Sequence, residues 1–369
     1  MKSLLMGHIA SPHEFPKPYF EKYNASNFKK QGVLFGLWAW RNVLEMDTYF
    51  GPVITEFDMS FLDDYDLIFI VGIKAAPSDV YNNPVDGYNR VAWVRKNFPH
   101  LKIVLMSDIG AGFYTIRKVD SPYAGAYERI REQIKDADVF LQLCWAYINE
   151  LKDFFKVDNV YTIEPVDFEE YNHWVSKAGS LSRKRNLIAV TRHNEMSHEN
   201  LRRMMQTARV VQQVNPTVYF RFFSIMNPAD LIPQRYKEYK WTFHELFTDI
   251  RPMQSADLFI RDLSECGIFI DNITCSSAGP RFSFTSSILK IPSVFNTGLA
   301  EALYPELAIP PVKHITDTWN DMLWAEKIKR LLEDDAWYKE MSELVYRRIW
   351  EKCRPEAVKK ELFTLLNLS

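Results

Sequence analysis

Short apolar runs alternate with helical patterns through most of the first half of the chain. Within each run apolar residues follow one another, and between the runs they recur at helical spacing. Strand, helix and strand in repetition predict a parallel sheet covered by helices. The predicted strands of this half are residues 3–9, 53–57, 67–72, 101–106, 139–143 and 159–163, and the predicted helices are residues 27–48, 84–97 and 123–135.

The alternation starts again after a polar stretch at residues 166–185, which has no sustained period and is predicted to be a linker. A strand count that begins anew predicts a second domain with its own parallel sheet. We therefore predict an α/β protein with two Rossmann-like domains, residues 1–165 and 186–345, and a C-terminal helix at residues 346–369. The predicted strands of the second half are residues 186–190, 217–223, 267–271 and 293–296, with helices at residues 199–214, 257–265 and 279–289 and a helical tail at residues 319–366.

Composition agrees with two ordinary globular domains. The chain has 369 residues, of which 47% are hydrophobic and 25% charged, and this argues against disorder or a fibrous repeat. Its 45 basic and 47 acidic side chains leave a net charge of -2, so no overall field attracts nucleic acid or an anionic membrane. The four cysteines are widely spaced, and neither a signal peptide nor a membrane-spanning apolar run is present. This pattern predicts free thiols in a soluble, cytoplasmic protein.

Parallel α/β sheets bind ligands beyond the carboxyl ends of their strands, so the residues after each predicted strand are candidates for chemistry. Asp108 follows the predicted strand at residues 101–106. A carboxylate held there by a buried strand can act as general base toward a hydroxyl group, and a turn or helix-capping aspartate is the alternative. His8 lies at the end of the first predicted strand, where an imidazole can act as base or hold a phosphate. A histidine packed within a loop is the alternative there.

Two segments of the second half carry groups that bind anions. The predicted helix at residues 279–289 begins with small residues, a glycine and an arginine, so free backbone N–H groups and the helix dipole favour a diphosphate there. The segment after the predicted strand at residues 186–190 supplies another cation and further hydrogen-bonding groups. An ordinary capped helix and solvated side chains are the alternative. The candidates are Ser277, Gly279 and Arg281 in the first segment and Thr191, Arg192 and His193 in the second.

Other functional motifs are missing or misplaced. Asp64-Tyr65-Asp66 has the Asp-x-Asp pattern of some metal-dependent sugar transferases, but it precedes the predicted strand at residues 67–72. It therefore belongs to the amino end of the sheet, where a solvated turn is expected. No set of histidines, cysteines and carboxylates has zinc-site spacing, and no Walker loop or GxGxxG fingerprint occurs. We expect no metal site, and neither an NTPase nor a standard dehydrogenase.

The layout of two Rossmann-like domains, an anion-binding helix start in the second and a long helical tail resembles glycosyltransferases of the GT-B fold. The resemblance implies an acceptor domain at residues 1–165 and a nucleotide-sugar domain at residues 186–345 that face a central cleft. The segments similar to the donor half of that family are residues 263–271, 277–281 and 289–294.

One feature departs from the family pattern. Many members carry two glutamates eight positions apart around the donor helix, and Ser277 and Thr285 stand at the aligned places. The ribose contact made by those glutamates is therefore in doubt. This leaves three alternatives: other residues hold the nucleotide, the donor is atypical, or activity has been lost.

Within the fold, the chain resembles the phage DNA β-glucosyltransferases. Met106-Ser107-Asp108-Ile109 is similar to the context of their catalytic aspartate, and Thr191-Arg192-His193 is similar to the arginine-containing loop that opens their second domain. The resemblance implies Asp108 as the base, with Arg192 and Arg281 on the diphosphate of the donor.

We therefore expect an enzyme that moves a sugar from a nucleoside diphosphate donor, a UDP-sugar, to an acceptor hydroxyl without a cofactor. The phage likeness implies a hydroxymethylated base in double-stranded DNA as the acceptor, which is a DNA modification. The alternatives are a transferase that acts on a carbohydrate or a lipid-linked acceptor, or a protein of this fold that binds a nucleotide sugar without turnover. The candidate catalytic residues are Asp108 and His8, and the candidate donor-binding residues are Thr191, Arg192, His193, Ser277, Gly279, Arg281 and Thr285.

Overall fold

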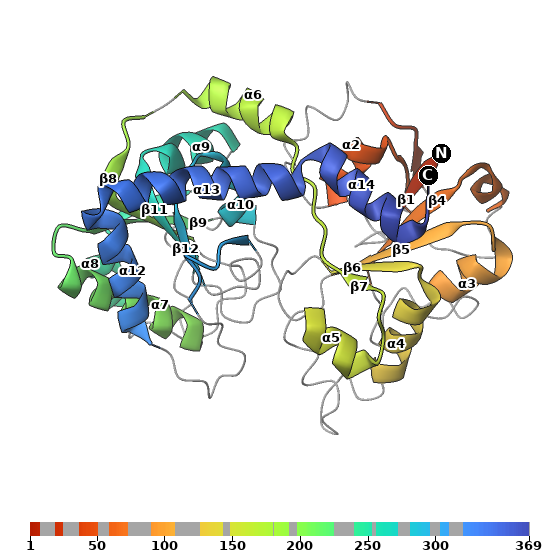
Figure 1. The fold of residues 1–369 in the computed structure, drawn as a ribbon, viewed down its shortest axis with the longest axis horizontal. Helices are drawn as coiled ribbons and strands as arrows, with labels where there is room; N and C mark the ends of the chain where they lie inside the picture. Colours follow the sequence, from red (N-terminus) through yellow and green to blue (C-terminus); the bar gives the residue numbers. More distant parts are fainter. Residues whose placement is uncertain are drawn as a thin grey trace. The chain divides into compact units, whose positions relative to one another are not determined.

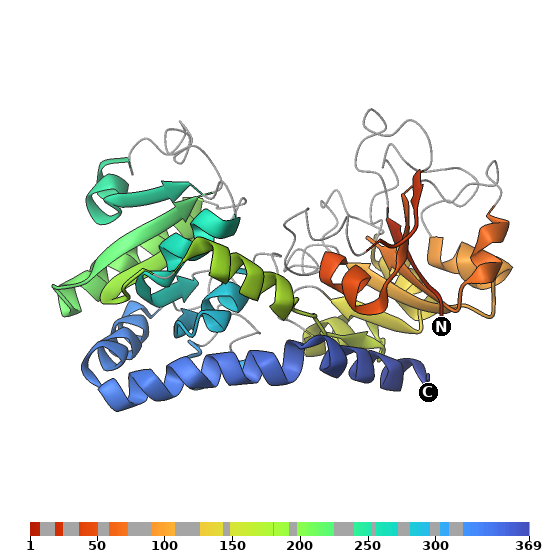
Figure 2. The same cartoon turned by 90° about the horizontal axis from the view of Figure 1, so that it is seen from above.

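The chain forms two compact units in the computed structural model. Unit 1 comprises Met1–Asp167 and Cys353–Ser369, and unit 2 comprises Phe168–Lys352. Both chain ends therefore belong to unit 1 (Figure 2). The structure describes residues 1–7, 19–24, 37–50, 59–72, 90–107, 126–142, 148–179, 181–191, 198–224, 240–252, 256–271, 281–295, 303–309 and 320–368.

Unit 1 is built on a seven-stranded sheet with the order β2-β3-β1-β4-β5-β6-β7. All neighbouring strands are parallel except β2, which pairs antiparallel with β3 at one edge. The strands are β1 (Ser3–Gly7), β2 (Tyr19–Glu21), β3 (Asp47–Phe50), β4 (Leu67–Val71), β5 (Lys102–Ser107), β6 (Val139–Gln142) and β7 (Val160–Tyr161) (Figure 1).

Helices cover both faces of this sheet because successive side chains of a strand point to opposite faces. Leu4 lies in the buried cluster with residues of α3, α4 and α5, whereas its neighbour Leu5 lies in the cluster with residues of α2 and α14. The last helix, α14, thus completes the core of unit 1 beside α2 (Figure 1). The helices of this unit are α2 (Leu37–Leu44), the 3-10 helix η1 (Ser60–Asp64), α3 (Arg90–Asn97), α4 (Ala126–Asp136), α5 (Ile148–Phe155) and α14 (Pro355–Leu366).

Unit 2 is built on a five-stranded parallel sheet with the order β10-β9-β8-β11-β12. Its helix α12 packs on α7, and α6 packs on α9. The strands are β8 (Lys184–Thr191), β9 (Tyr219–Ser224), β10 (Asp249–Pro252), β11 (Cys266–Asp271) and β12 (Ser293–Phe295). The helices are α6 (Phe168–Ala178), α7 (His198–Val214), α8 (Lys240–Leu246), α9 (Ala256–Ser264), α10 (Arg281–Ile288), α12 (Asp321–Glu333) and α13 (Asp335–Cys353).

The predicted fold class is confirmed, because both units are α/β with parallel sheets. Two local predictions differ from the structure, and a third is not tested by it. Residues 168–178, expected within a linker, form α6, whose Phe168 and Tyr171 are buried one turn apart. Helix was predicted to continue to residue 48, but α2 ends at Leu44 and β3 begins at Asp47. The strand predicted at residues 53–57 lies outside the described residues.

The predicted C-terminal helix at residues 346–369 is two pieces in the structure. Helix α13 runs to Cys353, and α14 starts at Pro355 after an extended Arg354. Proline lacks the N–H that a continuing helix needs and disfavours helical geometry in the residue before it, so the helix breaks here. This break lets the last helix pack on the sheet of unit 1.

The short strands β2 and β10 were not predicted from the sequence. Their sequences are Tyr-Phe-Glu and Asp-Ile-Arg-Pro, each with charged residues and too short to show a period. Both are edge strands, where one side of the backbone is not paired within the sheet and such composition is common.

Candidate functional site

The carboxyl ends of β8 and β11 lie side by side at the centre of the unit 2 sheet. Val190 of β8 is in register with Ile270 of β11. The chain leaves β8 toward β9 on one side and leaves β11 toward β12 on the other. Strands that part in opposite directions leave room for a ligand between the loops that follow them, which is the usual binding position in open α/β sheets.

The two predicted donor segments begin at these two strand ends. Thr191 is the last residue of β8, and Arg281 is the first residue of α10, the helix that follows β11. Arg192 and His193 directly follow β8, and Ser277 and Gly279 lie between β11 and α10; these four residues are outside the described part of the chain. The strand order therefore brings the starting points of both segments to the same edge of the sheet.

Helix α10 is enclosed within unit 2. All of its residues from Ser283 to Ile288 are buried. The Oγ of Ser286 lies 2.6 Å from the Oγ of Ser293 on β12. The guanidinium of Arg183 donates to the carbonyl oxygens of Leu289 and Lys290 just beyond the helix, at 2.6 and 3.0 Å. These contacts hold the helix against the sheet and satisfy acceptors at its carboxyl end.

Thr285 is the one predicted donor residue whose side-chain position the structure describes. Only 2% of the residue is exposed, and its Oγ1 is 2.8 Å from the Oη of Tyr171 on α6. The hydroxyl therefore links α10 to α6 through a buried hydrogen bond. Sequence reasoning did not single out Tyr171, because no local pattern shows which helix lies against α10.

In unit 1 the candidate catalytic residues follow β1 and β5. His8 comes directly after Gly7, the last residue of β1, and Asp108 comes directly after Ser107, the last residue of β5. Both residues lie outside the described part of the chain. Strand β4 separates β1 from β5 in the sheet, so the two positions start at the same edge, two strands apart.

A buried arginine fixes the end of β4 between these positions. The Nη2 of Arg90, at the start of α3, donates to the carbonyl oxygens of Val71 and Gly72 at 3.0 and 3.5 Å. The N–H of Gly72 donates to the carbonyl oxygen of Met106 at 2.8 Å. Gly72 has a φ of 89°, which favours glycine. Sequence reasoning missed Arg90, because it considered only residues that follow strands.

Gln142 is a second polar residue at this edge that the sequence analysis missed. It ends β6, is 1% exposed and stands in register with Ser107 of β5. A polar residue that closes an apolar strand, Val-Phe-Leu-Gln, was the available signal.

The Asp-x-Asp segment lies at the opposite edge, as predicted. Asp66 precedes β4, and its Oδ2 accepts the backbone N–H of Lys2 at 2.7 Å. Asp64 lies 3.5 Å from the Nζ of Lys2. The side chains of Asp64 and Asp66 are 73% and 61% exposed, so this is a solvated turn at the amino edge. Across the described residues, no group of three histidine, cysteine or acidic side chains is placed to hold a metal ion.

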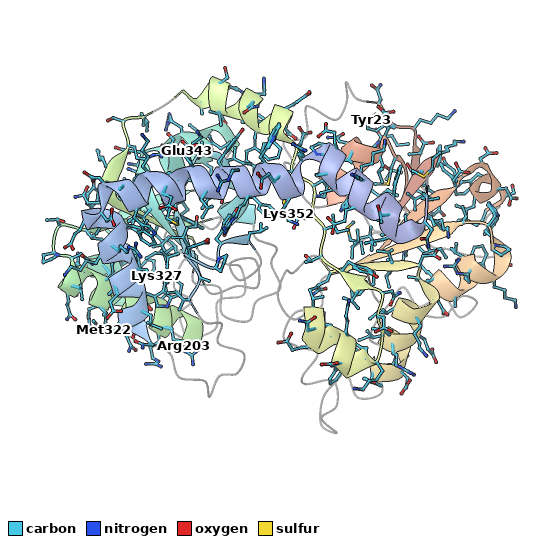
Figure 3. The ribbon with its side chains drawn as sticks, viewed as in Figure 1. Tyr23, Arg203, Met322, Lys327, Glu343 and Lys352 are labelled. Atoms are coloured by element: carbon cyan, nitrogen blue, oxygen red, sulfur yellow. The ribbon has the colours of Figure 1, made fainter. Side chains whose placement is uncertain are left out.

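A charged cluster holds residues 303–309, the described segment that comes after β12 in the chain. Arg348 of α13 forms a two-point pair with Glu306, with both N···O distances 2.7 Å. Lys327 lies on α12 (Figure 3), and its Nζ donates to the carbonyl oxygen of Glu306 at 2.6 Å. The hydrogen bond from Arg348 lowers the pKa of Glu306, and burial lowers the pKa of Lys327. The cluster thus ties residues 303–309 to α12 and α13.

None of the described helices is long and apolar enough to cross a membrane.

No protein-family model matches the chain, and the search of curated proteins finds no match. Solved structures match it in three dimensions. Trehalose 6-phosphate synthase from Burkholderia multivorans is 10% identical, with a TM-score of 0.62 over 99% of this chain and 98% of that one. HepE from Anabaena, solved in complex with UDP, is 11% identical, with a TM-score of 0.58 over 100% of both chains.

TarM from S. aureus is 14% identical, with a TM-score of 0.55 over 84% of this chain. The match covers 58% of TarM, so this chain spans little more than half of that protein's length. At such identities the likeness establishes the fold. The two units, each with a parallel sheet, together with the helices at the end of the chain, form a fold of the GT-B type.

Proposed function

We propose that this protein is a glycosyltransferase that moves a sugar from a nucleoside diphosphate to a hydroxyl group of an acceptor. The observation that carries the proposal is the meeting of β8 and β11 at the centre of the unit 2 sheet, where both predicted anion-binding segments begin. Two proteins of similar structure, HepE and TarM, were solved with UDP, which favours a UDP-sugar as donor.

The donor's diphosphate lies, in this proposal, between the end of β8 and the start of α10. Arg192 and Arg281 supply positive charge and two-point hydrogen bonds, and the first N–H groups of α10 add the field of a helix start. These groups stabilise the charge that grows on the diphosphate as the bond to the sugar breaks. Thr191, His193, Ser277 and Gly279 complete the proposed donor site, and Thr285 supports it from within α10, where its hydroxyl is bonded to Tyr171.

The proton transfer is assigned to unit 1. Asp108 takes the proton of the acceptor hydroxyl as its oxygen attacks the anomeric carbon, and the bond from that carbon to the β-phosphate oxygen breaks. The electron pair of that bond leaves with the diphosphate. His8, which follows β1 at the same edge of the sheet, is the second residue assigned to this acceptor side. Arg90 supports the arrangement by holding the end of β4 between the two positions.

We propose a carbohydrate hydroxyl as the acceptor. Two of the similar structures concern carbohydrates: trehalose 6-phosphate synthase, and TarM in complex with α-GlcNAc-glycerol. The net charge of -2 also disfavours duplex DNA, because nucleic-acid affinity comes largely from basic side chains on phosphates. The hydroxymethylated base expected from the phage likeness remains the second acceptor to test.

The test is turnover with a matched pair of variants. A panel of UDP-sugars is incubated with short glycans, sugar phosphates and hydroxymethylated duplex DNA, and release of UDP is measured. Asp108→Asn is expected to lower kcat by about 10²- to 10⁴-fold with little change in UDP affinity. Asp158→Asn, at an exposed position of unit 1, is the control and should leave both unchanged. UDP binding without turnover on any acceptor would favour a nucleotide-sugar-binding protein instead.

A further inference from the structure

We infer that Tyr171 is a positioning residue of the donor site, acting through Thr285 on the start of α10. The inference rests on the proposed function and adds a residue to it. It begins from the 2.8 Å hydrogen bond between the hydroxyls of Tyr171 and Thr285. Tyr171 is fully buried and Thr285 is 2% exposed, so the bond is shielded from water. Buried hydroxyls need hydrogen bonds. This bond therefore restrains the relative orientation of the two helices at this point, in addition to their packing.

The bond lies near the middle of α10, since Thr285 is the fifth of its eight residues. Thr285 is four residues after Arg281, which places it about 6 Å along the helix axis from the first residue. The Arg183 contacts are at the other end of the helix. Tyr171 thus contacts α10 from α6, between the start of the helix and the Arg183 contacts.

The position of a helix start matters for an anion more than for general packing. Backbone N–H groups stabilise a growing charge only when they lie within a few tenths of an ångström of their best positions. The Tyr171 hydrogen bond is directional, so it sets the rotation of α10 about its own axis. Its loss removes one restraint on this rotation, and the first N–H groups of α10 are then held less well toward the diphosphate.

The variant Tyr171→Phe tests the positioning role of the Tyr171 hydroxyl, with Tyr338→Phe as the matched control. The control removes the same atom in the same unit, because the Oη of Tyr338 donates to the carbonyl oxygen of Gly267 at 2.9 Å. That bond lies at the amino end of β11, the edge of the sheet opposite to the proposed donor site. UDP affinity is measured by calorimetry, and urea unfolding is measured for each variant. Tyr171→Phe should weaken UDP binding by about 3- to 10-fold, whereas Tyr338→Phe should lose comparable stability and keep its UDP affinity.

Two variants of Thr285, the other residue of the hydrogen bond, extend the test. Thr285→Ser keeps the hydroxyl and should bind UDP like the wild type, whereas Thr285→Val removes it and should match Tyr171→Phe. The double variant Tyr171→Phe with Thr285→Val should bind no more weakly than either single variant, because one shared bond is lost. With acceptor present, the expected change is in the KM of the donor, with the KM of the acceptor unaltered. If Tyr171→Phe does not fold, the comparison of Ser and Val at position 285 gives the same answer.

The outcomes separate the inference from the proposed function. Wild-type protein that binds no nucleoside diphosphate overturns both. Wild-type protein that binds UDP, with Tyr171→Phe and Thr285→Val equal to Tyr338→Phe in affinity, overturns the positioning role and leaves the donor site standing. A selective loss of UDP affinity in Tyr171→Phe and Thr285→Val, restored in Thr285→Ser, supports the inference.

Discussion

The two edges of the unit 2 sheet use charged residues in different ways. At the amino edge, the side chain of Arg221 pairs with Asp249 and Glu265, both at 2.7 Å, and Lys184 also pairs with Glu265. At the carboxyl edge, the described ends of β8 and β11 lead into segments that contain Arg192 and Arg281. The amino edge carries this network of ion pairs, yet the strand order predicts that a ligand binds at the carboxyl edge. A dense network of ion pairs is therefore not in itself a sign of function.

The largest expected effect is on activity at the carboxyl edge. Arg192→Met should lower kcat/KM by about 10²- to 10³-fold, because it removes a donor to the departing diphosphate. The unfolding midpoint should stay near that of the wild type. The control is Arg251→Met at the amino edge, where the side chain is 43% exposed and pairs with Asp249. Turnover at the wild-type rate in Arg192→Met would contradict the assignment of donor binding to the carboxyl edge.

The next effect is on stability at the amino edge. Arg221 is 4% exposed, so Arg221→Met leaves two carboxylates side by side without their shared cation. We expect the free energy of unfolding to fall by about 3 kcal/mol, with UDP affinity unchanged. Urea denaturation measures the loss. Arg261→Met removes a 3.1 Å pair whose arginine is 41% exposed, and it should cost less than about 1 kcal/mol. Equal losses in the two variants would contradict the distinction between buried and exposed pairs.

A third prediction concerns close packing at the start of β11. A Cβ on Gly267 would lie 2.4 Å from the Cα of Arg185, beside a register shift between β8 and β11. Gly267→Ala should therefore destabilise unit 2 by about 1–3 kcal/mol, since the backbone of β8 must move. Gly179→Ala is a useful comparison, because that site has open space but a φ of 71°. It should cost about 1 kcal/mol from conformation alone. The midpoints of thermal unfolding of the Gly267→Ala and Gly179→Ala variants measure these two losses of stability.

The smallest effect is a pH dependence at the amino edge. Hydrogen bonds from Lys184 and Arg221 lower the pKa of Glu265 below its ordinary value of 4.5. A carboxyl whose pKa is lower in the folded state stabilises the fold above its unfolded pKa, and this stability is lost as pH falls through the folded pKa. Glu265→Gln should therefore show a shallower loss of stability on acidification below about pH 4.5 than the wild type. Glu340→Gln, at an exposed position, should keep the wild-type slope when urea midpoints are compared across pH.

The sequence predicted the general fold well because alternation is a local property. The period of apolar residues shows whether a segment is a helix or a strand and which face is buried, so the two α/β units and most strands followed from it. It also placed Asp108 after β5, Thr191 at the end of β8 and Arg281 at the start of α10. Short edge strands such as β2 and β10 were not predicted, because a few residues cannot show a period.

What the tertiary structure alone decided was which segments are neighbours. Only the sheet order shows that β8 and β11 are adjacent, so that Thr191 and the segment leading to Arg281 start from one edge. Only packing shows that α14 completes the core of unit 1 and that Tyr171 reaches Thr285 across 114 positions of chain. The physical reason is that local pattern reports a residue's face, whereas long-range pairing depends on the burial of all elements together.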